Sequence, residues 1–175
     1  MTSAADPPRH NTTQAERDTV LRALGLTGPE PELDAFATQL AQEADVPYAM
    51  VNIFGDQQQF FGLHTPRNDS ALPTIGRHMP VDHGFCPDVV DRKLALVLPN
   101  VHSHPRFSGN AVVDLIGINT YAGAPLLHGD TVLGTLCFVG LKERDQSTGP
   151  DTLDLIKRRR DDVMNFLYQR AGLQP

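Results

Sequence analysis

Histidine is the residue type whose placement most suggests chemistry in this sequence of 175 residues. Imidazole titrates near neutral pH and binds zinc, iron or copper, so histidines that gather in loops can form a metal site. No HExxH motif or paired-cysteine spacing accompanies them, which favours ordinary loop hydrogen bonding over a metal ligand set. Convergence of His102 and His104 with His83 and Cys86 would instead provide a metal or haem site. Six of the seven histidines lie in segments that we expect to be loops or turns: His64, His78, His83, His102, His104 and His128.

The two cysteines, Cys86 and Cys137, are the other candidates for chemistry. Neither has a CxxC partner, so a zinc or redox motif is not indicated and we expect reduced thiols. Cys86 follows Gly84 and Phe85 at an expected loop-to-helix junction, where a helix N-terminus would lower the thiol pKa and favour thiolate chemistry. The alternative is a small buried apolar side chain, which is the interpretation that we prefer for Cys137 inside an apolar strand.

Other catalytic patterns do not occur in the sequence, which contains no glycine-rich phosphate loop, no GxSxG motif and no convincing Ser, His and Asp order. The composition, 40% hydrophobic and 21% charged, is that of a globular domain, and the formal charge of −6 opposes non-specific binding to nucleic acid or an anionic membrane. A membrane helix would need about 18 consecutive apolar residues, and no such run or signal-peptide core is present. We expect a cytoplasmic protein with no nucleic-acid or membrane partner, and catalysis is not indicated.

The elements that must position these residues begin after a polar tail, residues 1–12, that we expect to be disordered. Capping-box spacing over Thr13–Glu16 predicts a first helix that ends near Gly25. Apolar residues at helical spacing over residues 33–44 predict a second helix. A long amphipathic helix is expected over residues 150–170.

Between these helices the hydrophobic period changes to two, which predicts strands. Residues 64–80 and 102–119 have little regular patterning and are expected to be long connections. Because no alternating βαβ unit occurs, the order favours an α+β fold, an antiparallel sheet with helices to one side. The strand segments, which include two hairpins, are residues 48–54, 59–61, 94–98, 121–127 and 132–139.

Five segments together resemble the GAF domain family. They are VPYAMVNIF at residues 46–54, GFCPDVV at 84–90, HPRF at 104–107, YAGAPL at 121–126 and GTLCF at 134–138. The resemblance implies a single domain over residues 13–172, with its core at about residues 30–170. It also implies a six-stranded antiparallel sheet with N- and C-terminal helices on one face, and a pocket formed by loops and short helices on the other.

The resemblance places candidate ligand-binding residues on strands and covering loops around that pocket. Aromatic walls suit planar or apolar ligands, and plain core packing is an equal alternative for Phe54 and Phe61. No catalytic residue or metal site is predicted, and the cofactor stays unknown. The pocket candidates are Phe54, Phe61, His83, Phe85, Cys86, His104, Phe107 and Tyr121.

The function implied is a sensory or regulatory module that binds an unidentified small molecule and acts in trans on a separate signalling or transcriptional output protein. One alternative is a cysteine-based redox enzyme or a metal- or haem-binding redox sensor, although the cysteine arrangement of the family's free methionine-sulfoxide reductases is missing. Another is a ligand-free dimerisation or docking module. A homodimer through the terminal helices is predicted from two apolar stripes, Leu33, Phe36 and Leu40 on one and Leu153, Ile156, Val163 and Leu167 on the other.

Overall fold

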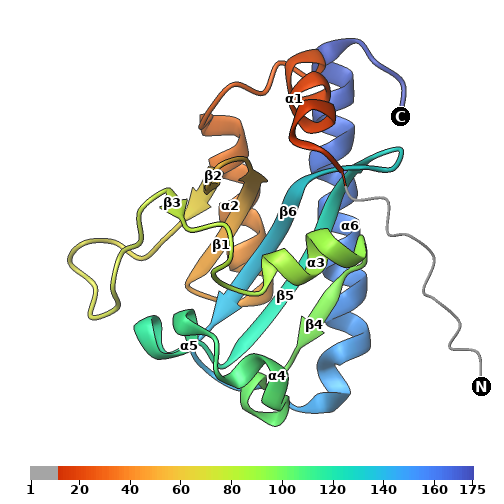
Figure 1. Ribbon diagram of the computed structural model, residues 1–175. Helices are drawn as coiled ribbons and strands as arrows, with labels where there is room; N and C mark the ends of the chain where they lie inside the picture. The colour runs from red at the N-terminus through yellow and green to blue at the C-terminus, as the bar shows by residue number, and fades with distance from the viewer. Residues whose placement is uncertain (1–11) are drawn as a thin grey trace, which may run out of the picture.

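An antiparallel sheet forms the middle layer of the protein, whose computed structural model describes residues 12–175 (Figure 1). The strands are β1 (Tyr48–Phe54), β2 (Gln58–His64), β3 (His78–Met79), β4 (Leu96–Leu98), β5 (Thr120–His128) and β6 (Thr131–Gly140). The helices are α1 (Gln14–Ala23), α2 (Pro31–Ala44), α3 (Cys86–Arg92), α4 (Pro105–Ser108), α5 (Ala111–Ile116) and α6 (Gly149–Ala171), with 3₁₀ turns at Val101–Ser103 and Gln146–Thr148. Among the helices of residues 12–175, none is both long and apolar enough to cross a membrane.

The strand order is β3-β2-β1-β6-β5-β4, and every neighbouring pair is antiparallel. The predicted α+β class, the six-stranded sheet and both hairpins are thereby confirmed. The connection predicted over residues 64–80 contributes the short strand β3, which pairs with Gln58 and Gln59. A strand of two residues is too short for a period of two to be visible in the sequence.

The first helix forms as its capping signal predicts. The Thr13 hydroxyl accepts from the Glu16 amide, and the Glu16 carboxylate accepts from the Thr13 amide. Thr12 Oγ1 accepts from the Val132 amide at 3.0 Å, and the buried Arg17 donates from Nε to the Val132 carbonyl at 2.8 Å. These bonds fix α1 to the start of β6. The rest of the predicted tail lies outside the described residues.

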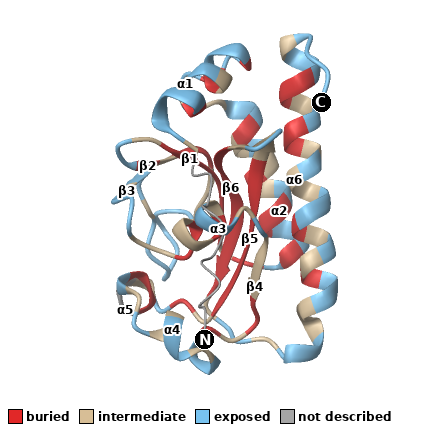
Figure 2. Cartoon of the chain, turned by 45° about the vertical axis from the view of Figure 1, so that its right-hand side comes forward, coloured by how far each residue is buried: buried red, intermediate tan, exposed pale blue. Residues whose placement is uncertain are grey.

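The two longer helices, α2 and α6, cover one face of the sheet, and their buried sides turn towards it (Figure 2). Leu33 and Leu40 on α2 and Ile156, Val163 and Leu167 on α6 are fully buried. Burial of such a side chain contributes about 1.5–3 kcal/mol to stability. The apolar stripes that predicted a homodimer are therefore largely used within the chain's own core, and they give that prediction no support.

The other face of the sheet is covered by parts of the chain between β2 and β5, which include α3, α4 and α5 (Figure 1). A second buried cluster lies beneath it and contains Tyr48 and Tyr121. The Tyr48 hydroxyl donates to the Pro73 carbonyl at 2.5 Å, which ties the long connection to β1. The loop-covered face is thus covered by short helices and by loops that are held with hydrogen bonds. The helix-covered face is instead closely packed with apolar side chains.

Glycine at position 62 permits the closest approach of α2 to the sheet. A Cβ added there would overlap the Leu33 carbonyl group and lie 2.9 Å from Val51 Cγ2. Neither neighbour is the free end of a flexible side chain, so the backbone of α2 would have to move.

We expect Gly62→Ala to lower the free energy of unfolding by about 1–3 kcal/mol, because the helix must separate from β2. Urea titration followed by circular dichroism measures the change. Gly28→Ala is the matched control, since a Cβ there meets nothing within 4 Å. Equal stabilities of the two variants would contradict the close packing of α2 on β2.

Candidate ligand-binding cavity

A cavity of about 190 Å³ lies between the loop-covered face of the sheet and the chain above it. Most of the side chains that line it are aliphatic, sulfur-containing or aromatic. None of the described residues that line it is Asp, Glu, Lys or Arg. The lining residues are Met50, Asn52, Ile75, Gly76, His78, Met79, Gly84, Phe85, Cys86, Val112, Ile116, Ile118, Tyr121, Cys137 and Val139.

The floor of the cavity follows from the pairing of β1 with β6. Successive side chains of a strand point to opposite faces, so Met50 and Asn52 share one face of β1. In the antiparallel register Met50 pairs with Cys137 and Asn52 pairs with Thr135. Directly opposed residues project to the same face of a sheet, so these four side chains lie on the loop-covered face, and Met50, Asn52 and Cys137 form the floor of the cavity.

The two cysteines meet at this floor. Cys86, the first residue of α3, lies with its Sγ 3.5 Å from the Sγ of Cys137. The Thr135 hydroxyl donates to Cys86 Sγ at 3.1 Å, and the Tyr121 hydroxyl oxygen lies 3.2 Å from the same sulfur. Both cysteines are free and buried.

Hydrogen bonding separates the acidities of the two thiols. Burial raises the pKa of Cys86, but hydrogen bonds with Cys137, Thr135, Tyr121 and Asn52 together outweigh burial and lower the pKa to about 7. The hydrogen bond to Cys86 and burial both raise the pKa of Cys137 well above its ordinary value. Cys86 is therefore the thiol that ionises, and Cys137 keeps its proton. Cys86 does begin a helix as predicted, but side-chain donors rather than the helix N-terminus account for its lowered pKa.

Tyr121 reaches the sulfur because the strand carries a glycine two residues later. The side chain of Tyr121 lies along β5 over Gly123, where an added Cβ would overlap the tyrosine hydroxyl. Burial raises the pKa of Tyr121 well above its ordinary value, and the nearby Cys86 and Cys137 raise it further. Tyr121 therefore keeps its proton at neutral pH and can donate to the Cys86 sulfur. The YAGAPL segment thus places a hydroxyl donor in the cavity wall.

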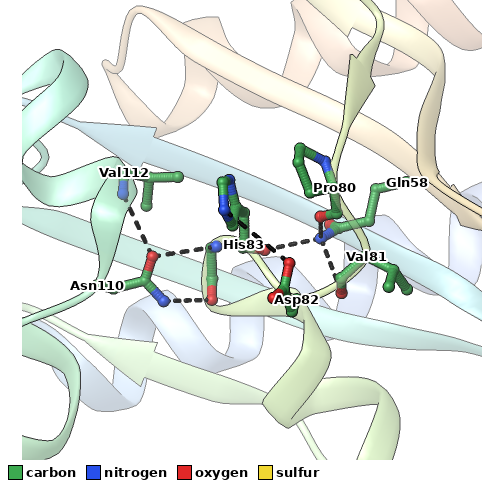
Figure 3. Close-up of polar contacts among 8 residues, drawn as sticks. Gln58, Pro80, Val81, Asp82, His83, Asn110 and Val112 are labelled. Carbon is green, nitrogen blue, oxygen red and sulfur yellow. Dashed lines mark hydrogen bonds and ion pairs between the residues drawn. The ribbon is translucent and has the colours of Figure 1, made fainter.

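A chain of amide groups fixes the orientation of Asn52. Gln58 Nε2 donates to the carbonyl oxygens of Pro80, Val81 and His83 at 2.9, 3.3 and 2.7 Å (Figure 3). Because these carbonyls can only accept, the other end of the Gln58 amide must be oxygen, and it accepts from Asn52 Nδ2 at 2.7 Å. The remaining polar atom, Asn52 Oδ1, is buried and has no hydrogen-bond partner among the residues that the structure describes.

A second amide holds the other end of the same loop. Asn110 Oδ1 accepts from the amides of Gly84 and Val112, and Asn110 Nδ2 donates to the Gly84 carbonyl at 2.7 Å (Figure 3). Gly84 has a φ of +79°, a conformation that a glycine adopts at little cost. The loop of residues 80–84 is thus held between Gln58 and Asn110 immediately before Cys86.

The structure brings together only part of the predicted pocket. Phe54 and Phe107 pack in the core under the loops without lining the cavity. Phe61 is wrong as a pocket residue, because it packs on the helix-covered face whereas its neighbour Phe60 points to the loop-covered one. Three of the eight predicted residues line the cavity: Phe85, Cys86 and Tyr121.

His83 and His104, the two histidines among the predicted pocket residues, lie outside the cavity wall, whereas His78 lines it. His83 contributes its backbone carbonyl to Gln58, and its ring Nε2 lies 3.9 Å from the Asp82 carboxylate. His104 precedes α4, with its ring centroid 6.3 Å from that of Phe107. The described part of the chain, residues 12–175, contains no group of three or more His, Cys, Asp or Glu side chains that could hold a metal ion. His83, His102, His104 and Cys86 therefore do not form the convergent site that was the alternative.

Sequence reasoning missed most of the cavity floor. Asn52 carried a usable signal, because an amide within a buried strand requires hydrogen-bond partners and marks a polar site. Cys137 carried none, since its position 51 residues after Cys86 does not indicate contact. The cavity is lined by residues of the sheet, of the covering loops and of α5. Which of them meet depends on how the long connection folds back onto the sheet, and local sequence patterns do not predict this.

The comparisons with known proteins agree with this architecture. Residues 28–158 match the GAF domain family. The GAF domain of an Acinetobacter phosphoenolpyruvate-protein phosphotransferase is similar in structure, with 15% identity, a TM-score of 0.60 and coverage of 94% of this chain and 99% of that chain. No curated protein matches the sequence.

Two further structures have the same fold and different activities. A phycoerythrobilin-bound GAF domain from a cyanobacterial phytochrome has 16% identity, a TM-score of 0.62 and coverage of 90% of this chain and 97% of that chain. A type II free methionine-R-sulfoxide reductase from Thermoplasma acidophilum has 10% identity, a TM-score of 0.59 and coverage of 79% and 91%. At these identities the likeness concerns the fold alone. Because the family match spans most of the chain and the sheet and helices agree with it, the chain belongs to the GAF domain family.

Proposed function

We propose that this GAF domain is a sensory module that binds a small, uncharged, largely apolar molecule carrying one hydrogen-bond donor. The observation that carries the proposal is the apolar cavity with a buried acceptor, Asn52 Oδ1, that has no partner. An unsatisfied buried polar atom costs about 1–3 kcal/mol, which a donor on the ligand would recover. The absence of Asp, Glu, Lys and Arg from the described lining favours an uncharged ligand, because a charge buried there would have none of these side chains as a partner.

The size of the cavity limits the ligand to about one ring. An apolar cavity of about 150 Å³ accommodates benzene, so about 190 Å³ suits a six-membered ring with a small substituent. A bilin such as that bound by the cyanobacterial domain is far larger. An open cavity also argues against the alternative of a ligand-free docking module, in which bulky side chains would fill the space.

A chain of hydrogen bonds through Asn52 and Gln58 connects the cavity to the surface of the protein. A ligand that engages Asn52 acts on the amide that holds Gln58, and Gln58 in turn holds the carbonyls of residues 80–83. Val81 in this loop is 45% exposed. We propose that a separate output protein recognises this loop, whose order changes when the cavity fills.

Phenol is the probe that tests the cavity, since it combines one ring with one hydroxyl donor. We expect Val112→Phe, which fills the cavity from α5, to abolish phenol binding measured by isothermal titration calorimetry. Val81→Phe introduces the same side chain outside the cavity wall and should leave binding unchanged. Undiminished binding to Val112→Phe would place the phenol elsewhere and contradict the proposed site.

A second comparison tests the acceptor. The wild-type protein should bind phenol about tenfold more tightly than toluene, because one donor to a buried acceptor contributes about 1–3 kcal/mol. In Asn52→Leu, which keeps the branched shape of the side chain, the two affinities should become equal. A preference for phenol that survives this substitution would show that Asn52 does not select the ligand.

If this chain of hydrogen bonds holds the loop of residues 80–86, its removal should speed up hydrogen exchange in that loop. Gln58→Leu removes the donor to three carbonyls, so amides of residues 80–86 should exchange about tenfold faster when measured by mass spectrometry. Gln59→Leu changes the neighbouring residue, whose side chain points away from this loop, and should leave their exchange unaltered. Unchanged exchange in Gln58→Leu would mean that the amide does not control the loop.

A further inference from the structure

The cavity contains a pair of thiols that the binding of a neutral ligand does not require. Cys86 and Cys137 come from different layers, one from the covering chain and one from the central strand β6. Their sulfur atoms nevertheless lie 3.5 Å apart, and both residues line the same cavity. A solute that enters the cavity therefore reaches both sulfurs.

The surroundings of Cys86 differ from those of an inert core cysteine. Thr135 and Cys137 donate to its sulfur, and Tyr121 lies at hydrogen-bond distance. These donors lower the pKa of Cys86 to about 7, so a large fraction of the thiol is ionised at neutral pH. The thiolate is the nucleophilic form of cysteine, whereas Cys137 stays protonated beside it.

We propose that Cys86 and Cys137 form a hydroperoxide-reactive site that closes to an intramolecular disulfide. The Cys86 thiolate attacks the terminal oxygen of a hydroperoxide ROOH, the O–O bond breaks, and Cys86 becomes a sulfenic acid while RO⁻ takes a proton to leave as ROH. The Cys137 sulfur then attacks the Cys86 sulfur and expels hydroxide, which leaves as water with the thiol proton. In sum, two thiols and ROOH give a disulfide, ROH and H₂O, with two electrons passing from the sulfurs to the peroxide.

The second step requires little movement. A disulfide has an S–S distance of about 2.0 Å, so the sulfurs must approach each other by about 1.5 Å. Cys137 is held in β6, which has a neighbouring strand on either side. Cys86 begins a helix of only seven residues after the Gly84 turn, and it is therefore the residue that moves.

Hydrogen peroxide is small enough to enter this cavity. The cavity admits water-sized molecules, and peroxide is only slightly larger than water. Asn52, which lines the same cavity, carries a buried acceptor, Oδ1, without a partner among the described residues. The reaction needs no bound metal.

The test uses the full chain, reduced and then treated with hydrogen peroxide. Intact mass and thiol titration after unfolding should show loss of two thiols, no dimer and full reversal by dithiothreitol. At pH 7 the native chain should react about tenfold faster than the same chain in urea, because an ordinary thiol is only a few per cent ionised there. The rate should reach half its maximum near pH 7.

Substitutions assign the steps to the two cysteines. Cys137→Ser should stop at a sulfenic acid that gains 16 Da and reacts with dimedone, and Cys86→Ser should lose the fast reaction. Thr135→Val removes a donor and should slow the reaction at pH 7 about tenfold. Thr120→Val is its control, a buried threonine that donates to the Leu98 carbonyl and does not touch Cys86.

The rates of the native wild-type chain and of the same chain in urea can be compared even where a cysteine variant fails to fold. Native thiols that react no faster than those of the unfolded chain would overturn the proposal, as would disulfides that link two chains. Equal rates for Thr135→Val and Thr120→Val would contradict the role of the donors. Because none of these measurements uses phenol, a failure here is distinguishable from a failure of the proposed ligand binding.

Discussion

The pairing of β1 with β6 is the constraint on which the rest of the structure depends. It is possible because residue 134 is glycine, where a Cβ would overlap the Asn52 carbonyl of the neighbouring strand. Any side chain there would separate the two strands or shift their register. The register sets Asn52 opposite Thr135 and Met50 opposite Cys137, so the contact of two backbones determines which side chains form the floor of the cavity.

The two faces of this central pair of strands bury different kinds of side chain. On one face, α2 and α6 supply aliphatic side chains whose burial stabilises the fold without polar atoms to satisfy. On the other face, Asn52, Thr135 and Tyr121 place polar groups in the interior, and each such group costs free energy unless it is bonded. Gln58 and Cys86 satisfy most of them, and Asn52 Oδ1 has no partner among the described residues. The buried polar side chains of the central pair thus lie on the loop-covered face, and the close apolar packing of the long helices lies on the other.

The sequence predicted the parts of this arrangement that depend on local pattern. Periods of 3.6 and two, the Thr13 capping box and the hairpin turns are short-range signals, and the helices and principal strands follow them. The cavity could not be predicted in the same way, because its walls come from residues that only the folded long connection brings to the sheet. Phe60 and Phe61 illustrate the difficulty, since adjacent aromatic residues in a buried strand point to opposite faces and composition does not distinguish them. The contact between Cys86 and Cys137 is likewise visible only once α3 is placed on β6.

Two hydroxyl groups, those of Tyr121 and Thr135, connect the proposed sulfur chemistry to the proposed ligand binding. In the reduced protein, Tyr121 and Thr135 direct their protons to the Cys86 sulfur, which is a strong acceptor when ionised. A disulfide sulfur carries no charge and accepts hydrogen bonds weakly, so oxidation would leave both hydroxyls in need of another acceptor. The cavity wall would then offer the Tyr121 hydroxyl as a donor, and a ligand that also carries an acceptor would be favoured. If the disulfide forms as proposed, the Tyr121 hydroxyl is the group through which the oxidation state of the sulfurs would act on the proposed ligand.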